Sequence, residues 1–163
     1  RLLALFGHSM GAILAYEVAR TLQSRHRLSL ARLIVSGHNA PQLPRRAGPA
    51  LVDDEALVAE LRRLGGTPPE VLANRELLEL VLPTYRADLA LLNSYRHEPG
   101  PRLRCPVTVL AGAADPDTTP EGLNAWRELT DCECTLLTFP GDHFYLMHNA
   151  HLVFPVIAGA LSG

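Results

Sequence analysis

The sequence predicts an α/β protein built around a mostly parallel sheet. Four apolar runs have the composition of strands: residues 2–6, 31–37, 106–111 and 134–139. Helical stretches lie between them, and continuous apolar strands that alternate with helices are typical of a parallel sheet covered on both faces. The 163 residues are 47% hydrophobic and 20% charged, which is enough for one globular domain with its own core.

The first strand leads into a pentapeptide with a chemical signature. Residues 7–11 read Gly-His-Ser-Met-Gly, and a helical stretch covers residues 12–20. Strand, sharp turn and helix in this order form the nucleophile elbow of the α/β-hydrolase fold. We therefore expect Ser9 to be the nucleophile and the backbone N–H of Met10 to form part of the oxyanion hole. Both flanking glycines should be small, because strand and helix pass close together there.

Residues from about 41 to 104 break the alternation, because helix signals follow one another without a strand. A proline-rich loop at 41–49 comes first. The helix signals are an Asp53 or Asp54 cap ended by Gly65-Gly66, a capping-box spacing from Thr67 to Glu70, and an Asn74 start interrupted by Pro83. We therefore divide the domain into a core, residues 1–40 and 105–163, and a helical insertion. Such an insertion is either a lid or additional packing over the sheet.

The last third returns to strands and helices, with helices predicted over about 120–129 and 146–161. A catalytic serine needs a histidine base and a carboxylate, and the order Ser, acid, His is that of the α/β-hydrolases. Asp115 is the candidate acid, since it follows the strand 106–111 and precedes a proline; Asp117 is its rival. His143 is the candidate base, since a Pro-Gly turn joins it to the strand 134–139.

Other titratable residues receive structural interpretations. His8 should pack the elbow without a catalytic part, whereas His38 follows the neighbouring strand and could line the pocket. The odd number of cysteines, Cys105, Cys132 and Cys134, argues against a disulfide framework and fits a reducing cytoplasm. The Cys-x-Cys pair lacks nearby histidines, so it makes a poor metal site. We expect no metal and no cofactor.

Charge and hydropathy argue against two classes of partner. The formal net charge is −2 and basic runs do not exceed a pair, which does not fit a nucleic-acid binder. No apolar stretch approaches the ~20 residues that span a bilayer. We expect a cytoplasmic monomer that binds neither nucleic acid nor membrane.

Five segments match the motifs of a known family. They are LFGHSMGA at 5–12, LRRLGGTPPE at 61–70, LVLP with RAD at 80–88, CPVT at 105–108 and PGDHFYL at 140–146. Through them the whole chain resembles the type II thioesterases of polyketide and nonribosomal peptide synthesis, and the insertion sequence is the discriminating part. The resemblance implies that Ser9 attacks a thioester on the phosphopantetheine arm of an acyl or peptidyl carrier protein, with Asp115 as acid and His143 as base. The helices of residues 50–98 would form the lid.

The sequence departs from that family at its start. Family members carry early strands and a glycine-containing oxyanion loop before the elbow. We therefore expect the chain to be a fragment whose second oxyanion donor lies elsewhere. Losing one such donor costs about 10²–10³ in rate, so residues 1–163 alone should hydrolyse thioesters very poorly.

Two other functions stay open from the sequence: a generic carboxylesterase, and a non-catalytic binding module that retains the hydrolase fold. The basic residues of the insertion also allow two interpretations, either contact with an acidic carrier protein or a solvated helix face. These residues are Arg62, Arg63, Arg86 and Arg96.

Overall fold

The computed structural model describes residues 3–28, 30–44 and 53–162. Its sheet consists of β1 (Ala4–His8), β2 (Arg32–Ser36), β3 (Val107–Gly112) and β4 (Cys134–Phe139). All neighbouring strands are parallel and the spatial order is β1-β2-β3-β4. The four predicted strands are confirmed, with β4 at its predicted bounds. The first strand, however, begins at Ala4 and continues through Gly7 into His8, and Leu2 lies outside the described residues.

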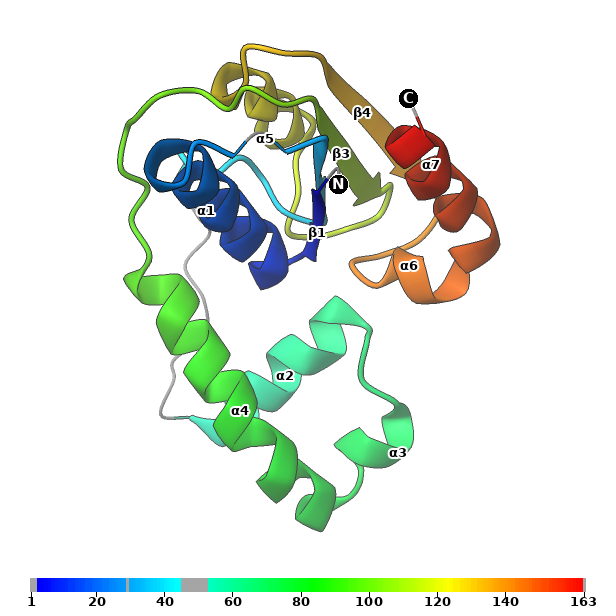
Figure 1. Ribbon diagram of the computed structural model, residues 1–163. Helices are drawn as coiled ribbons and strands as arrows, with labels where there is room; N and C mark the ends of the chain where they lie inside the picture. The colour runs from blue at the N-terminus through cyan, green and yellow to red at the C-terminus, as the bar shows by residue number, and fades with distance from the viewer. Residues whose placement is uncertain (1–2, 29, 45–52, 163) are drawn as a thin grey trace.

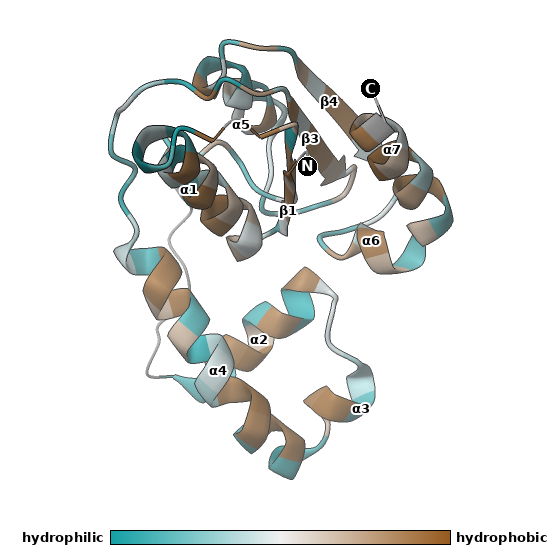
Figure 2. Cartoon of the chain, viewed as in Figure 1, coloured by the Kyte–Doolittle hydropathy of each residue, from teal (hydrophilic) through white to brown (hydrophobic). Residues whose placement is uncertain are grey.

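Helices cover both faces of the sheet (Figure 1). One face packs against α1 (Met10–Arg25), α5 (Pro120–Asn124) and the 3-10 helix η1 (Ala125–Leu129), and the other against α6 (Tyr145–His148) and α7 (Ala150–Ser162). Successive side chains of a strand point to opposite faces, so Leu33 and Val35 pack toward α1 whereas Ile34 packs toward α7. In Figure 2 the strands are mostly hydrophobic, and the helices carry both colours.

Two predicted helices are each divided in the structure. The helix expected over 120–129 consists of α5 followed by η1. The helix expected over 146–161 is broken at Asn149, between α6 and α7. The side-chain amide of Asn149 donates to the carbonyl oxygens of Pro140 (2.7 Å) and Tyr145 (3.0 Å). Such side-chain bonds to the backbone compete with helix propagation.

The described part of the insertion contains helices and none of the strands of the sheet, as predicted, and it has a hydrophobic cluster of its own. Its helices are α2 (Asp54–Leu64), α3 (Pro69–Leu72) and α4 (Arg75–Ser94). Asp53 caps α2 by accepting from two backbone N–H groups, Gly65 ends it with φ 85°, and Asn74 caps α4. The buried members of the cluster are Leu57, Leu61, Leu82 and Leu89.

Two local predictions in the insertion are wrong. The N-cap of α3 is Pro68, without a side-chain cap bond, so Thr67 closes no capping box. Pro83 does not interrupt α4. A proline inside a helix removes one N–H donor, but buried leucines on both sides of it keep the two halves packed on α2. Of the loop predicted at 41–49, residues 41–44 are described and lie outside helices and strands, and the remainder lies outside the described residues.

The cysteines are free thiols, and Cys105 lies in the core. Among the helices of the described residues, none combines the length and apolar character that a membrane span requires.

Of the two glycines that flank the elbow, only Gly7 is required by the close crossing of β1 and α1. A Cβ on Gly7 would lie 1.9 Å from the carbonyl oxygen of Gly11, whereas a Cβ on Gly11 would meet nothing within 4 Å. The expectation that both flanking positions must be small is therefore wrong for Gly11.

We expect Gly7→Ala to lower the free energy of unfolding by about 3 kcal/mol or more, since the added methyl group would overlap backbone atoms of α1. Gly11→Ala, the matched control, should stay within about 0.5 kcal/mol of the wild type. Denaturant unfolding of both variants measures the difference. Equal stability of the two variants would contradict the packing described here.

Candidate active site

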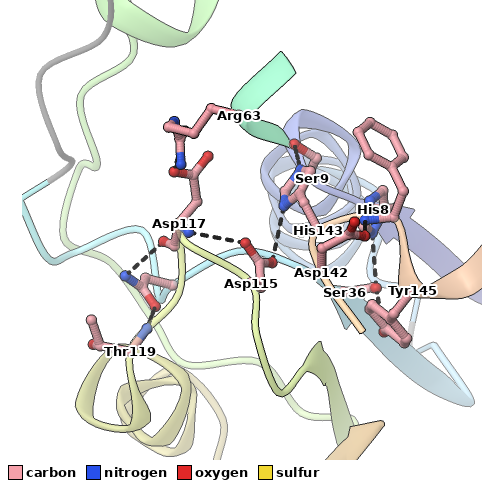
Figure 3. Close-up of polar contacts among 12 residues, drawn as sticks. His8, Ser9, Ser36, Arg63, Asp115, Asp117, Thr119, Asp142, His143 and Tyr145 are labelled. Carbon is pink, nitrogen blue, oxygen red and sulfur yellow. Dashed lines mark hydrogen bonds and ion pairs between the residues drawn. The ribbon is translucent and has the colours of Figure 1, made fainter. Parts of the chain in front are cut away.

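Predicted site residues meet at one edge of the sheet. Because the strands are parallel, their carboxyl ends lie on the same side. Ser9 directly follows β1, Asp115 follows β3 and His143 follows β4. The structure therefore brings together three residues that are far apart in the sequence (Figure 3).

Ser9, His143 and Asp115 form a hydrogen-bonded chain. His143 Nδ1 lies 2.9 Å from Asp115 Oδ2, and His143 Nε2 lies 2.9 Å from Ser9 Oγ. An ionised carboxylate only accepts hydrogen bonds, so Nδ1 donates to Asp115 and Nε2 can accept from the Ser9 hydroxyl. His143 is 2% exposed and Asp115 6%, so little water competes for these bonds. Such an arrangement can take the proton of a serine hydroxyl that attacks an acyl carbon.

The backbone at Ser9 has the strained geometry of an elbow. Ser9 has φ 54° and ψ −121°, a conformation that residues other than glycine rarely adopt. Its N–H donates to the carbonyl oxygen of Ser36 (2.8 Å), which ties the elbow to β2. Although Ser9 is the N-cap of α1, its hydroxyl makes no cap bond and is directed to His143 instead. The N–H of Met10 lies at the helix N-terminus, where the helix dipole favours negative charge.

The two candidate acids have different surroundings. Asp115 accepts from His143 through Oδ2 and from the backbone N–H of Asp117 through Oδ1 (2.9 Å). The carboxylate of Asp117 accepts from Arg63 Nη2 of α2 (2.5 Å). The geometry therefore assigns the contact with His143 to Asp115, and Asp117 supports that carboxylate through its backbone.

A second histidine lies against His143 in a network that the sequence did not predict. The rings of His8 and His143 have centroids 4.9 Å apart. His8 Nδ1 lies 2.9 Å from Ser36 Oγ, which is 2.7 Å from the hydroxyl of Tyr145. Burial, and secondarily repulsion by His143, lowers the pKa of His8 to about 4. His8 is therefore neutral at neutral pH. The available signal was Ser36, a polar residue that directly follows the apolar run of residues 33–35.

A cavity of about 390 Å³ adjoins Ser9 and is closed partly by the insertion. The core contributes Met10, His38 and His143, so His38 lines the cavity as expected. The insertion contributes the apolar residues Leu64, Leu89 and Leu92, and also Tyr85 and the acidic residues Glu60 and Asp88. A mostly apolar wall beside the candidate nucleophile suits an acyl chain.

Comparisons with known proteins agree with this geometry. A family model described as "Thioesterase domain" matches residues 2–160. The gramicidin S biosynthesis protein GrsT of Aneurinibacillus migulanus is 39% identical over 91% of this chain and 58% of its own length. Thioesterase PikA5 of Streptomyces venezuelae is 43% identical over 91% of this chain and 53% of its own length. The chain thus spans just over half the length of these curated relatives.

Solved structures extend the likeness to three dimensions. The type II thioesterase BorB from the borrelidin biosynthetic cluster matches with a TM-score of 0.87 and 45% identity, over 99% of this chain and 66% of that one. The thioesterase RedJ from the prodiginine pathway of Streptomyces coelicolor gives a TM-score of 0.80 and 43% identity, over 88% and 53%. Together with the parallel sheet, these structures confirm the predicted α/β-hydrolase fold.

We expect the low pKa of His8 to make stability depend on pH. Between pH 6.5 and about 4 this histidine is protonated in the unfolded chain but stays neutral in the folded protein. The contribution of His8 is therefore complete above pH 6.5 and is lost as the pH falls toward 4. Denaturant unfolding from pH 7 to 4 should show a shallower decline for His8→Gln than for the wild type. Parallel curves would contradict a buried, neutral His8.

Proposed function

This chain belongs to the thioesterase family, and on that premise we propose that it hydrolyses acyl thioesters on the phosphopantetheine arm of an acyl or peptidyl carrier protein in polyketide or nonribosomal peptide synthesis. The hydrogen-bonded chain of Ser9, His143 and Asp115 is the observation that carries the reaction class. The names of GrsT and BorB, which mention gramicidin S and borrelidin, support the pathway class. The free thiols support a reducing cytoplasm as the compartment.

The first half of the reaction transfers the acyl group to the enzyme. Ser9 Oγ attacks the thioester carbon while His143 Nε2 takes the hydroxyl proton. The N–H of Met10 donates to the oxyanion that develops on the carbonyl oxygen. The carbon–sulfur bond then breaks, and the imidazolium of His143 returns its proton to the departing sulfur. Asp115 holds the imidazole in the required tautomer and stabilises its positive charge.

The second half releases the acid. His143 accepts a proton from a water molecule that attacks the Ser9 ester, and it then protonates Ser9 Oγ as the ester bond breaks. Free carboxylic acid and the original enzyme result. The low pKa of His8 suits this cycle, because a second charged imidazole beside His143 would oppose formation of the imidazolium.

We assign residues 41–104 as a lid over the core of residues 1–40 and 105–163. Two observations support this assignment: the described helices have their own hydrophobic cluster, and α2 and α4 supply one wall of the cavity at Ser9. Extra packing over the sheet would not require side chains that face the nucleophile.

We expect variants of the two acids to separate their roles. Asp115→Asn should lower kcat by about 10³–10⁴ with a small acyl thioester, because the imidazole loses its orienting carboxylate. Asp117→Asn, two residues away, should cost no more than about tenfold, because the N–H that it donates to Asp115 is retained. Steady-state kinetics of the naturally encoded protein measures both. Similar losses in the two variants would contradict the assignment of Asp115.

The same preparation tests the reaction class. A fluorophosphonate should label the wild type and leave Ser9→Ala unlabelled; an unlabelled wild type would indicate a binding module. Higher kcat/KM with p-nitrophenyl esters than with carrier-bound thioesters would indicate a carboxylesterase.

The basic residues of the insertion differ in their surroundings. Arg63 and Arg86 form ion pairs with Asp117 and Asp54, whereas Arg62 is exposed in the last turn of α2. Complementary charge speeds the encounter of proteins, so Arg62 is the better candidate for contact with an acidic carrier.

We expect Arg62→Glu to raise KM for a carrier-bound thioester by about threefold to tenfold and to leave KM for a small thioester unchanged. Arg25→Glu is the matched control, since Arg25 is also exposed but lies in the last turn of α1, at the opposite end of that helix from Ser9. An effect of Arg62→Glu on both substrates would show that carrier recognition is not the cause.

A further inference from the structure

An ion pair joins the insertion to the loop that carries the candidate acid. Arg63, in the last turn of α2, binds the carboxylate of Glu60 through Nε (2.8 Å) and Nη2 (2.6 Å). The same Nη2 lies 2.5 Å from Asp117 Oδ1, in the loop after β3. By contrast, the ion pair of Arg75 with Glu79 stays within α4. The side chains of Arg63 and Asp117 are only 24% and 32% exposed, so solvent screens their attraction incompletely.

The residue that Arg63 holds is also the one that supports the acid. The N–H of Asp117 donates to Asp115 Oδ1, and the other oxygen of that carboxylate faces His143 Nδ1. On the core side, Asn39 contacts the same loop: its Nδ2 lies 3.4 Å from the carbonyl oxygen of Asp117, and its Oδ1 accepts from the N–H of Thr119. The loop is therefore held from the core by Asn39 and from α2 by Arg63. Figure 3 shows Arg63 directed at Asp117.

The end of α2 also touches the loop of the base. A Cβ on Gly65 would lie 2.6 Å from Asp142 Oδ2, and a Cβ on Gly66 would lie 2.2 Å from the ring of Phe144. Asp142 and Phe144 are the neighbours of His143 in the chain. One end of one helix thus rests against both loops that present the charge-relay groups.

We propose that Arg63 is a positioning residue through which α2 orients the Asp115 carboxylate toward His143. This inference rests on the proposed function. The Arg63 guanidinium fixes the Asp117 side chain and thereby the direction of the Asp117 N–H. Because this N–H donates to Asp115 Oδ1, its direction sets the rotation of the Asp115 carboxylate. The hydrogen bond from His143 to Asp115 is then best formed when α2 lies against the core. The insertion would therefore complete the catalytic geometry as well as shape the cavity.

The experiment is a double-mutant cycle on the naturally encoded protein with a small acyl thioester, which removes any contribution of carrier binding. Arg63→Met should lower kcat about tenfold with KM nearly unchanged, because the orientation of Asp115 is affected and the apolar wall of Leu64, Leu89 and Leu92 is kept. Asp117→Asn should cost about the same, and the double variant no more than either single one, because the two residues act as a unit. Arg63→Lys, which retains the charge, should recover most of kcat. Arg75→Met, at an exposed pair on α4, should match the wild type.

A second measurement needs no substrate. The proton between His143 Nδ1 and Asp115 Oδ2 should give a low-field proton NMR resonance in the wild type, Arg63→Lys and Arg75→Met, and a shifted or broadened one in Arg63→Met. An unchanged resonance and unchanged kcat in Arg63→Met would overturn the inference, as would losses that add in the double variant. If Arg63→Met unfolds, Asp117→Asn and Arg63→Lys still decide the question. A wild type that hydrolyses no thioester would refute the proposed function, and the NMR series would still test the role of Arg63.

Discussion

The parallel pairing of four consecutive strands is the constraint on which the rest of the structure depends. Each strand is hydrogen-bonded to the next in register, so all four carboxyl ends come to one edge. The turns that leave this edge have unusual backbones, with positive φ at Ser9, Gly37 and Gly141. Such turns keep the following residues close to the edge. A hydrogen bond between Ser9 and His143, 134 residues apart, becomes possible without a long loop.

Burial then determines how these groups behave. Because His143 and Asp115 are nearly inaccessible to solvent, the hydrogen bond between them is stronger than in water, and each additional charge nearby is more costly. His8 meets this condition as a neutral ring tied to Ser36 and Tyr145, so it fills space beside His143 without competing for a proton. The insertion is compatible with this buried site. Its apolar side chains pack in its own cluster and line the cavity, and the ion pair from its Arg63 is made with Asp117.

Structural features that depend on a few neighbouring residues were mostly predicted correctly from the sequence. The strands, the elbow and the caps at Asp53 and Asn74 follow from local patterns of apolar side chains and hydrogen-bonding groups. The local predictions failed where a tertiary contact opposes a local preference. Pro83 stays inside a helix because its surroundings are packed on α2, and Asn149 ends α6 because its amide reaches back to Pro140.

The sequence by itself therefore determined the fold class and a short set of candidate groups, because repeated strand–helix patterns and the Gly-x-Ser-x-Gly turn are local properties. Only the tertiary structure decided which of these candidate side chains contact one another. Asp115 and Asp117 lie in the same loop, and only the side chain of Asp115 points to His143, which separates the candidate acid from the residue that supports it. The partners of Asp117 and Ser36 are Arg63 and Tyr145, 54 and 109 residues away. Contacts over such separations arise from chain packing, and they leave no periodic pattern in the sequence.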